Sequence, residues 1–250
     1  MKILILLLYY NRPNMVKNAL YSIKDSTHTD WELAFMDDGS DKSALNVVAD
    51  VLGEDLRKVK YYNTKDSVED KRQRESGFYG GSIIGKHMND AIQESDADIC
   101  ILLCDDDALL PDYMSNLSKY FTEHPEVMYA YSHIVPYDPL KESALRIDPS
   151  RPLVGELLGA AQAFNSRTEP TNPVCHLDAS QVVWRRECNL AGCWFGFPRT
   201  KNLDESIYHG LFNKYGVCAF TGFRGQFKGI HFNQLCRLDA NSYAIIDKEE

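Results

Sequence analysis

Three consecutive aspartates, Asp105 to Asp107, are the residues whose types and spacing most clearly indicate chemistry. They come after an apolar run that is predicted to be a buried strand, Asp98 to Leu103. Because adjacent carboxylates repel one another, a purely structural role would be costly. Mg²⁺ or Mn²⁺ would relieve the repulsion, since both commonly combine one or two carboxylates with phosphate oxygens. The alternative is that these aspartates only cap the helix predicted after Pro111.

A second acidic segment, Asp37 to Asp41, comes after another short apolar run, Glu32 to Met36. Its sequence, Asp-Asp-Gly-Ser-Asp, also suits an ordinary polar turn that caps the next helix. Open α/β sheets bind ligands in the crevice beyond the carboxyl ends of their strands. We therefore expect both acidic segments at one edge of a sheet, where a metal ion and a nucleoside diphosphate would bind.

The first half of the chain alternates short apolar runs with helical patterns, which is typical of βαβ units. Strands are predicted at Lys2 to Tyr9, Glu32 to Met36, Lys58 to Tyr62, Asp98 to Leu103 and Val127 to Val135. Helices are predicted at Pro13 to about Lys24, at about Lys42 to Leu52, in a segment that runs through Ile92, and after Pro111. This order indicates an α/β fold with a Rossmann-like, mostly parallel central sheet and helices on both faces.

The alternation fades beyond Pro136, and the second half is interpreted as an α+β region. It contains a helical pattern near Leu153 to Phe164, a strand at Val182 to Arg185 and a helix that opens near Leu203. The stretch Thr64 to Ser76 is dense in both charges and is interpreted as a solvated loop.

Composition and charge narrow the function classes. The chain has 250 residues, 44% of them apolar and 25% charged, which is typical of a soluble globular domain. A net charge of −9 argues against a nucleic-acid partner, because binding to phosphates needs clustered Lys and Arg. Seven cysteines without a CxxC pair favour a reducing compartment, and we expect the cytoplasm.

The run Ile3 to Leu8 is too short to span a membrane and is interpreted as a strand rather than a signal; no transmembrane segment is expected.

Three segments resemble glycosyltransferase family 2, a large family of mostly inverting enzymes with the GT-A fold. They are Tyr10-Asn11-Arg12-Pro13, the stretch from Trp31-Glu32 through Met36-Asp37-Asp38-Gly39-Ser40, and Cys104-Asp105-Asp106-Asp107-Ala108-Leu109-Leu110-Pro111. Each segment alone is only moderately specific, but their order in one βαβ frame, over roughly residues 2 to 135, is a strong signal. The resemblance implies transfer of a sugar, by family habit from a UDP-sugar, to an acceptor hydroxyl with inversion. It also implies Mn²⁺ or Mg²⁺ as cofactor.

The resemblance also implies a division of labour within one domain. Residues 1–135 would bind the nucleotide-sugar donor, and residues 136–250 would bind a glycan, glycoprotein or glycolipid acceptor and supply the catalytic base. The donor would contact residues at the carboxyl ends of the first strands and in the helix before the fourth strand. These expected donor-binding residues are Tyr9, Tyr10, Asn11, Arg12, Asp37, Asp38, Lys86, Asp105 and Asp106.

The sequence departs from the family pattern at two positions. Cys104 stands where the first acid of the usual Asp-x-Asp-Asp motif is expected, so Asp106 and Asp107 are the expected metal ligands. Asp105 is then left to contact the ribose or a metal-bound water. Met88 stands where many relatives carry an arginine, and Lys86 is expected to supply that charge.

The catalytic base and a third metal ligand are expected in the second half. Asp204 is the first choice for the base and Glu205 the second; the alternative is that Asp204 only caps its helix. His231 resembles the late histidine that completes the metal site in the family, although a lone histidine is often structural. His176, Asp178 and the aromatic residues Trp194, Phe195 and Phe197 form an expected acceptor face, and packing in the core explains these aromatics equally well.

Two other functions compete with this interpretation. A nucleotidyltransferase would also use acids at strand ends, but it would ordinarily carry a glycine-rich, basic loop after the first strand, and Asn11-Arg12-Pro13 is not one. A non-catalytic module that binds a sugar or a nucleotide would keep the fold without turnover.

Overall fold

The computed structural model describes residues 1–64, 83–137, 168–174, 177–196 and 203–229. Several sequence predictions fall outside these ranges. They are the charged loop after Thr64, the helical pattern near Leu153 to Phe164, and the residues His176, Phe197 and His231.

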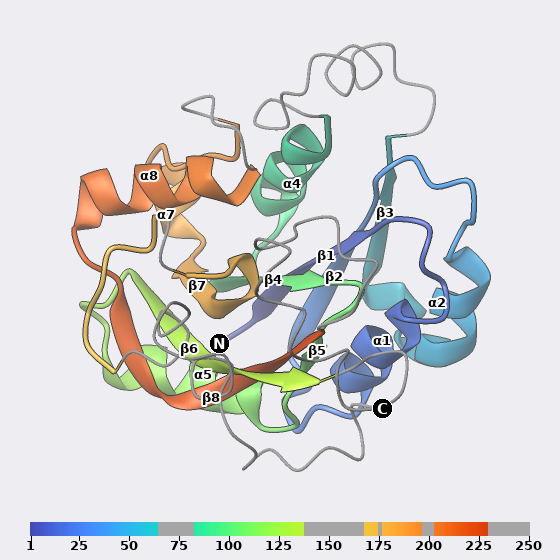
Figure 1. The fold of residues 1–250 in the computed structure, drawn as a ribbon, viewed down its shortest axis with the longest axis horizontal. Coiled ribbons are helices and arrows are strands. Elements are labelled where there is room, and N and C mark those ends of the chain that lie inside the picture. Colours follow the sequence, from blue (N-terminus) through green and yellow to red (C-terminus); the bar gives the residue numbers. More distant parts are fainter. Residues whose placement is uncertain (65–82, 138–167, 175–176, 197–202, 230–250) are drawn as a thin grey trace, which may run out of the picture.

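One sheet of eight strands, in the order β3-β2-β1-β4-β7-β6-β8-β5, forms the centre of the described structure (Figure 1). Its strands are β1 (Ile3–Tyr9), β2 (Trp31–Asp37), β3 (Val59–Asn63), β4 (Ile99–Cys104), β5 (Ala108–Leu109), β6 (Tyr129–Tyr137), β7 (Val182–Arg185) and β8 (Ala219–Gly229). Strands β1 to β4 pair in parallel, as do β6 and β8, whereas β7 and β5 pair antiparallel with their neighbours. The mostly parallel α/β sheet predicted from the sequence is therefore confirmed.

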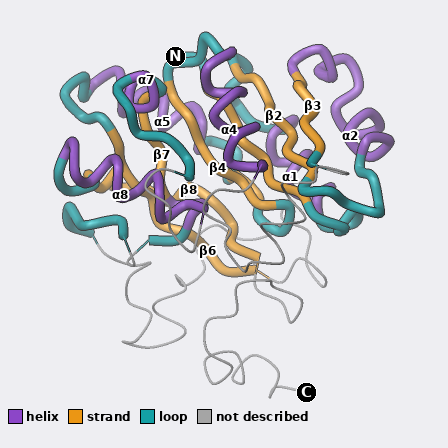
Figure 2. Tube along the Cα trace, turned by 90° about the horizontal axis from the view of Figure 1, so that it is seen from above, coloured by secondary structure: helices purple, strands orange, loops and turns teal. Residues whose placement is uncertain are grey.

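Helices cover both faces of this sheet, as predicted. They are α1 (Val16–Lys24), α2 (Leu45–Leu52), α4 (Ile83–Glu94), α5 (Tyr113–Glu123), α7 (Glu187–Leu190) and α8 (Leu203–Tyr215), with 3-10 turns η1 (Gly53–Lys58) and η4 (Ala179–Gln181). Alternate residues of β1 point to opposite faces, so Ile3, Ile5 and Leu7 pack with α1, α2 and α5, while Leu4 and Leu6 pack with α4, α7 and α8. Figure 2 shows the same sheet from above, with β3 near one end and β6 and β7 toward the other.

The predicted strands match the observed ones within two residues, but α1 and α2 each begin three residues later than predicted. At α1 the cause is a turn, in which the Met15 amide donates to the Arg12 carbonyl at 3.0 Å before the helix starts. Strands β5 and β8 were not predicted from the sequence. Strand β8 carries glycines at 222, 225 and 229 and no regular alternation of apolar and polar residues, so its period-2 signal is weak.

The described helices give no indication of a membrane span, since none of them is both long enough and apolar enough to cross a bilayer. The five described cysteines are free thiols: Cys100, Cys104, Cys188, Cys193 and Cys218.

Stability depends on the central strand β4. Ile101 lies in the middle of β4 and is fully buried in the core against the α1 face. We expect Ile101→Ala to lower the free energy of unfolding by about 2–5 kcal/mol, because the cavity adds to the lost burial. Leu190, which is 56% exposed, is the control, and Leu190→Ala should change this free energy by less than about 0.5 kcal/mol. Denaturant unfolding followed by circular dichroism measures both; equal shifts would contradict the assignment of β4 to the core.

Candidate active site

The three aspartates lie where β4 ends and β5 begins, beside the end of β8. In the antiparallel pair of β5 and β8, Ala108 lies opposite Phe227. Continuing this register by one and two residues brings Asp107 beside Lys228 and Asp106 beside Gly229. Strand β8, which the sequence did not predict, thus completes the site from the second half of the chain.

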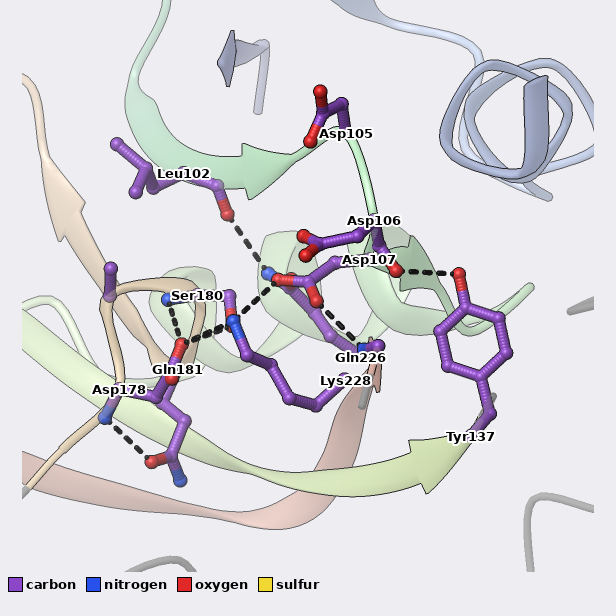
Figure 3. A network of polar contacts seen from close by, with 12 residues as sticks. Leu102, Asp105, Asp106, Asp107, Tyr137, Asp178, Ser180, Gln181, Gln226 and Lys228 are labelled. Atoms are coloured by element: carbon purple, nitrogen blue, oxygen red, sulfur yellow. Dashed lines mark hydrogen bonds and ion pairs between the residues drawn. The ribbon is translucent and has the colours of Figure 1, made fainter. Parts of the chain in front are cut away.

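Asp107 is fully buried and receives two donors from β8. The Gly229 amide donates to its Oδ1 at 2.9 Å, and the Lys228 ammonium lies 3.2 Å from its Oδ2. The same ammonium lies 3.2 Å from Oδ1 of Asp178, so Lys228 is shared between two carboxylates (Figure 3).

Asp105 and Asp106 are held from the other side by the loop after β1. The guanidinium of Arg12 bridges them, with Nη2 at 2.8 Å from Asp105 Oδ1 and Nη1 at 2.8 Å from Asp106 Oδ2. The Tyr10 amide donates to Asp105 Oδ2 at 2.9 Å. The structure therefore brings Tyr10, Arg12 and the aspartates together, as the sequence predicted.

The main chain of Asp106 leaves no room for a side chain at position 229, the last residue of β8. The Tyr137 hydroxyl donates to the Asp106 carbonyl at 2.8 Å (Figure 3). A Cβ at position 229 would lie 2.1 Å from the same carbonyl oxygen, far inside van der Waals contact. Glycine is required at this position because the two backbones approach so closely.

Burial makes the site electrostatically costly. It raises the pKa of Asp105 and of Asp107 to about 7, although Arg12 and Lys228, respectively, act in the opposite direction. Among the described residues, the four carboxylates of the triplet and Asp178 form ion pairs with Arg12 and Lys228. A bound cation would further lower the repulsion among these carboxylates.

The donor atoms also suit a divalent cation. Ligand atoms of Cys104, Asp106 and Asp107 all lie within 4.8 Å of one another. Burial raises the pKa of the Cys104 thiol well above its usual value, which leaves it protonated and a weak ligand. Mg²⁺ and Mn²⁺ prefer carboxylate oxygens, so Asp106 and Asp107 remain the residues that fit the metal.

The second acidic segment lies at the same edge of the sheet, as expected. Asp37, fully buried, accepts hydrogen bonds from the Ser40 amide at 2.9 Å, from the Asn63 side chain at 3.1 Å and from the Tyr61 hydroxyl. Through these contacts Asp37 stabilises the turn that follows β2. Asp38 is less buried, and its Oδ1 accepts from the Thr64 hydroxyl at 3.3 Å.

The loop after β1 is tied to this turn. The Tyr9 carbonyl accepts from the Asp38 amide at 3.0 Å, and the Asn11 amide donates to the Ser40 hydroxyl at 3.0 Å. Asn11 adopts a φ of 54°, a conformation that asparagine tolerates better than most residues. Tyr9 itself is buried in the core and its hydroxyl donates to the Lys42 carbonyl, so it supports the loop from below.

Lys86 was expected to contact the donor and Phe195 the acceptor, but both residues have other partners in the structure. Lys86 on α4 has a side chain that is 67% exposed and pairs with Asp90 at 2.6 Å. Its described contacts do not include Asp105, Asp106 or Asp107. Met88, which stands where the resemblance led us to expect an arginine, is fully buried in the core. Phe195 is also buried and packs edge-on against Trp184, which agrees with the core alternative.

The expected base lies close to the Asp178 side of the site. Asp204 and Glu205 occupy the first turn of α8, and both are partly buried. Burial, and then the charge of Asp178, raise the pKa of Asp204. Burial alone would also raise the pKa of Asp178, but Lys228 and donors from Ser180 lower it. Two neighbouring carboxylates with opposite shifts suit different roles, and the raised one suits proton transfer.

Three residues of this site were not predicted from the sequence in the roles that they have here. Lys228 and Tyr137 contact Asp107 and Asp106 through strand pairings that no local pattern encodes. Asp178 was expected at an acceptor face, whereas here it pairs with Lys228. The one local signal was the Asp-x-x-Gln pattern of Asp178 and Gln181, which forms a capping box.

The close approach at position 229 can be tested by substitution. We expect Gly229→Ala to lower the free energy of unfolding by about 1–3 kcal/mol, because the new methyl group must displace the main chain of Asp106. The matched control is Gly210→Ala in α8, where the added Cβ makes a tight contact of 3.3 Å with Cys193 and needs a shift of only a few tenths of an ångström, so its effect should be the smaller one. Denaturant unfolding measures both variants. If Gly229→Ala unfolds at the wild-type denaturant concentration, the register of β5 and β8 is wrong.

The amino-acid sequence is similar to that of known proteins over part of its length. Residues 4–78 match the family model for glycosyl transferase family 2. Protein CgeD of Bacillus subtilis (strain 168) is 30% identical over 131 residues, which make up 52% of this chain and 29% of that protein. The aligned region thus spans less than a third of this relative.

Solved structures show a similar fold at low identity. S. aureus TarS 1-349 in complex with UDP-GlcNAc gives a TM-score of 0.66 at 15% identity, over 98% of this chain and 64% of that one. Mannosyltransferase PcManGT from Pyrobaculum calidifontis, in complex with GDP-Man and Mn²⁺, gives 0.59 at 13%, over 93% and 58%. Glucosyl-3-phosphoglycerate synthase from Mycobacterium tuberculosis, with Mg²⁺ and UDP, gives 0.53 at 13%, over 93% and 72%. Residues 4–78 therefore match the glycosyl transferase family 2 model, and the described sheet has the fold of these solved glycosyltransferase structures.

Proposed function

We propose that this protein is a glycosyltransferase that moves a sugar from a nucleoside diphosphate donor, a UDP-sugar, to an acceptor hydroxyl with inversion. The observation that carries the proposal is the group of buried carboxylates at the carboxyl edge of the sheet, Asp105 to Asp107, beside the basic side chains of Arg12 and Lys228. Such a site suits a cation and a diphosphate together. The structures of similar fold in complex with UDP-GlcNAc and with UDP and Mg²⁺ support the choice of donor.

Asp106 and Asp107 would hold Mn²⁺ or Mg²⁺, and His231, outside the described residues, stays a predicted third ligand. The ion would supply positive charge that stabilises the departing diphosphate. Arg12, which pairs with Asp105 and Asp106, would contact a phosphate of the donor. Tyr10 and Asp38 would contact the nucleoside, and Asp37 would act by holding the turn that presents Asp38.

Asp204 is the proposed general base. It would remove the proton of the acceptor hydroxyl as the acceptor oxygen attacks the anomeric carbon, and the nucleoside diphosphate would leave with the electrons of the broken bond. A carboxylate whose pKa is raised by burial is better matched to this task than an ordinary one. Residues 1–135 would bind the donor and residues 136–250 the acceptor, a glycan, glycoprotein or glycolipid. The cytoplasm and its reducing conditions remain a prediction.

The nucleotide can be identified by thermal shift. With Mn²⁺ in excess, UDP should raise the melting temperature more than GDP or dTDP, because a ligand that binds only the folded state stabilises it by about 2.7 kcal/mol at a hundredfold excess over Kd. Asp106→Asn should remove the metal-dependent part of the shift. A shift with UDP that is identical in EDTA would exclude the metal at this site, and no shift with any nucleotide would exclude the donor site.

The base can be tested by turnover. We expect Asp204→Asn to lower kcat by about 10²–10⁴-fold while UDP binding is kept, because a positioned base contributes that much. The acidic limb of the pH profile of kcat/KM should lie above the usual carboxylate range, since the pKa of Asp204 is raised. Glu205→Gln is the matched control and should retain most of the activity. Unchanged turnover in Asp204→Asn would leave only its capping role, and turnover absent from the wild type would favour a non-catalytic module.

A further inference from the structure

The ammonium of Lys228 is held between two carboxylates that belong to different parts of the fold. It lies 3.2 Å from Asp107 Oδ2 and 3.2 Å from Asp178 Oδ1, and the lysine side chain is 17% exposed (Figure 3). Asp107 is an expected metal ligand, whereas Asp178 has no direct contact assigned to it in the proposed transfer reaction. The presence of a second acid on this lysine therefore needs a separate explanation.

Asp178 is fixed independently of the aspartate triplet. Its Oδ1 accepts from the Ser180 amide at 3.0 Å and from the Ser180 hydroxyl at 2.7 Å, as the cap of η4. The cap is closed by Gln181, whose Oε1 accepts from the Asp178 amide at 3.0 Å and whose Nε2 donates to the Ser132 carbonyl at 3.0 Å. Ser180 and Gln181 are fully buried. Asp178 is therefore a rigid anchor supported by β6, and it does not depend on Asp107 for its position.

A lysine that paired with Asp107 alone would compete with a metal ion for the same oxygen. An ammonium and a divalent cation repel each other at such distances, and the repulsion is strong where water is largely excluded. Sharing the ammonium with Asp178 weakens this competition, because the lysine keeps a carboxylate partner when the metal takes Asp107. Asp178 thus favours the metal, and Lys228 opposes it.

We propose that Asp178 is a positioning residue that keeps the Lys228 ammonium shared between two carboxylates and so sets the affinity of the site for its divalent cation. The inference rests on the metal site of the proposed function. It assigns opposite effects to two residues that contact each other, and that sign difference separates it from a purely structural role, in which loss of either residue would loosen the site.

The test is a titration of the full chain with Mn²⁺ alone at one fixed pH. The electron paramagnetic resonance signal of the free ion measures how much Mn²⁺ remains unbound at each step and so gives the Kd. We expect Asp178→Asn to weaken Mn²⁺ binding about tenfold and Lys228→Met to strengthen it about tenfold, as the removal of a near charge predicts. The double variant should bind Mn²⁺ more tightly than Asp178→Asn, because the lysine that Asp178 restrains is then absent. Lys228→Arg keeps the charge and should stay near the wild-type affinity.

The control is Lys119→Met on α5, a lysine whose side chain is 72% exposed and which pairs with Glu123, and its Mn²⁺ affinity should not change. Denaturant midpoints of all variants verify that they fold. If the wild type binds Mn²⁺ but Asp178→Asn and Lys228→Met both weaken binding, or neither changes it, the inference is wrong and the proposed metal site stands. If the wild type itself binds no Mn²⁺, the metal site is wrong and the inference falls with it.

Discussion

Repulsion between buried carboxylates is the constraint on which the rest of the site depends. Asp105, Asp106 and Asp107 are consecutive along the chain at the end of β4, where burial raises the pKa of the outer two. Ion pairs with Arg12 on one side and Lys228 on the other offset part of that cost. Both cations come from segments distant in sequence, so the fold must be complete before the triplet can be tolerated. Binding of a further cation would lower the repulsion among these carboxylates.

The sheet supplies the required geometry through two different kinds of pairing. Parallel pairing of β1, β2 and β4 collects the loop after β1, the Asp37 turn and the triplet at one edge. Antiparallel pairing of β5 with β8 then brings Lys228 and Gly229 against the triplet from the opposite side. The first arrangement is common to open α/β sheets, whereas the second depends on a bare glycine backbone at one residue.

These two pairings explain how far the sequence could predict the structure. Strong apolar runs such as Ile3 to Leu8 determine their own strands, and the strand direction then places the residues at their carboxyl ends, so the sequence could place the acidic segments and Arg12 at one edge of the sheet. Strand β8 has mixed burial and several glycines, and its role depends on partners more than a hundred residues away. The contacts of Lys228 and Tyr137 therefore lay beyond any local pattern, and only the capping box of Asp178 had a local signal. His231 remains a prediction, because it lies outside the described residues.

The position of β7 has a consequence for anyone who divides this chain into pieces. Strand β7, residues Val182–Arg185, lies between β4 and β6, which both precede residue 138. A fragment that stopped after β6 would leave β4, an almost wholly buried strand, with a bare hydrogen-bonding edge, and β6 would lose its partners on both sides. Exposed apolar edges recruit other chains, so such a fragment should aggregate instead of behaving as an autonomous nucleotide-binding unit. The proposed donor-binding and acceptor-binding halves therefore both contribute strands to one hydrogen-bonded sheet.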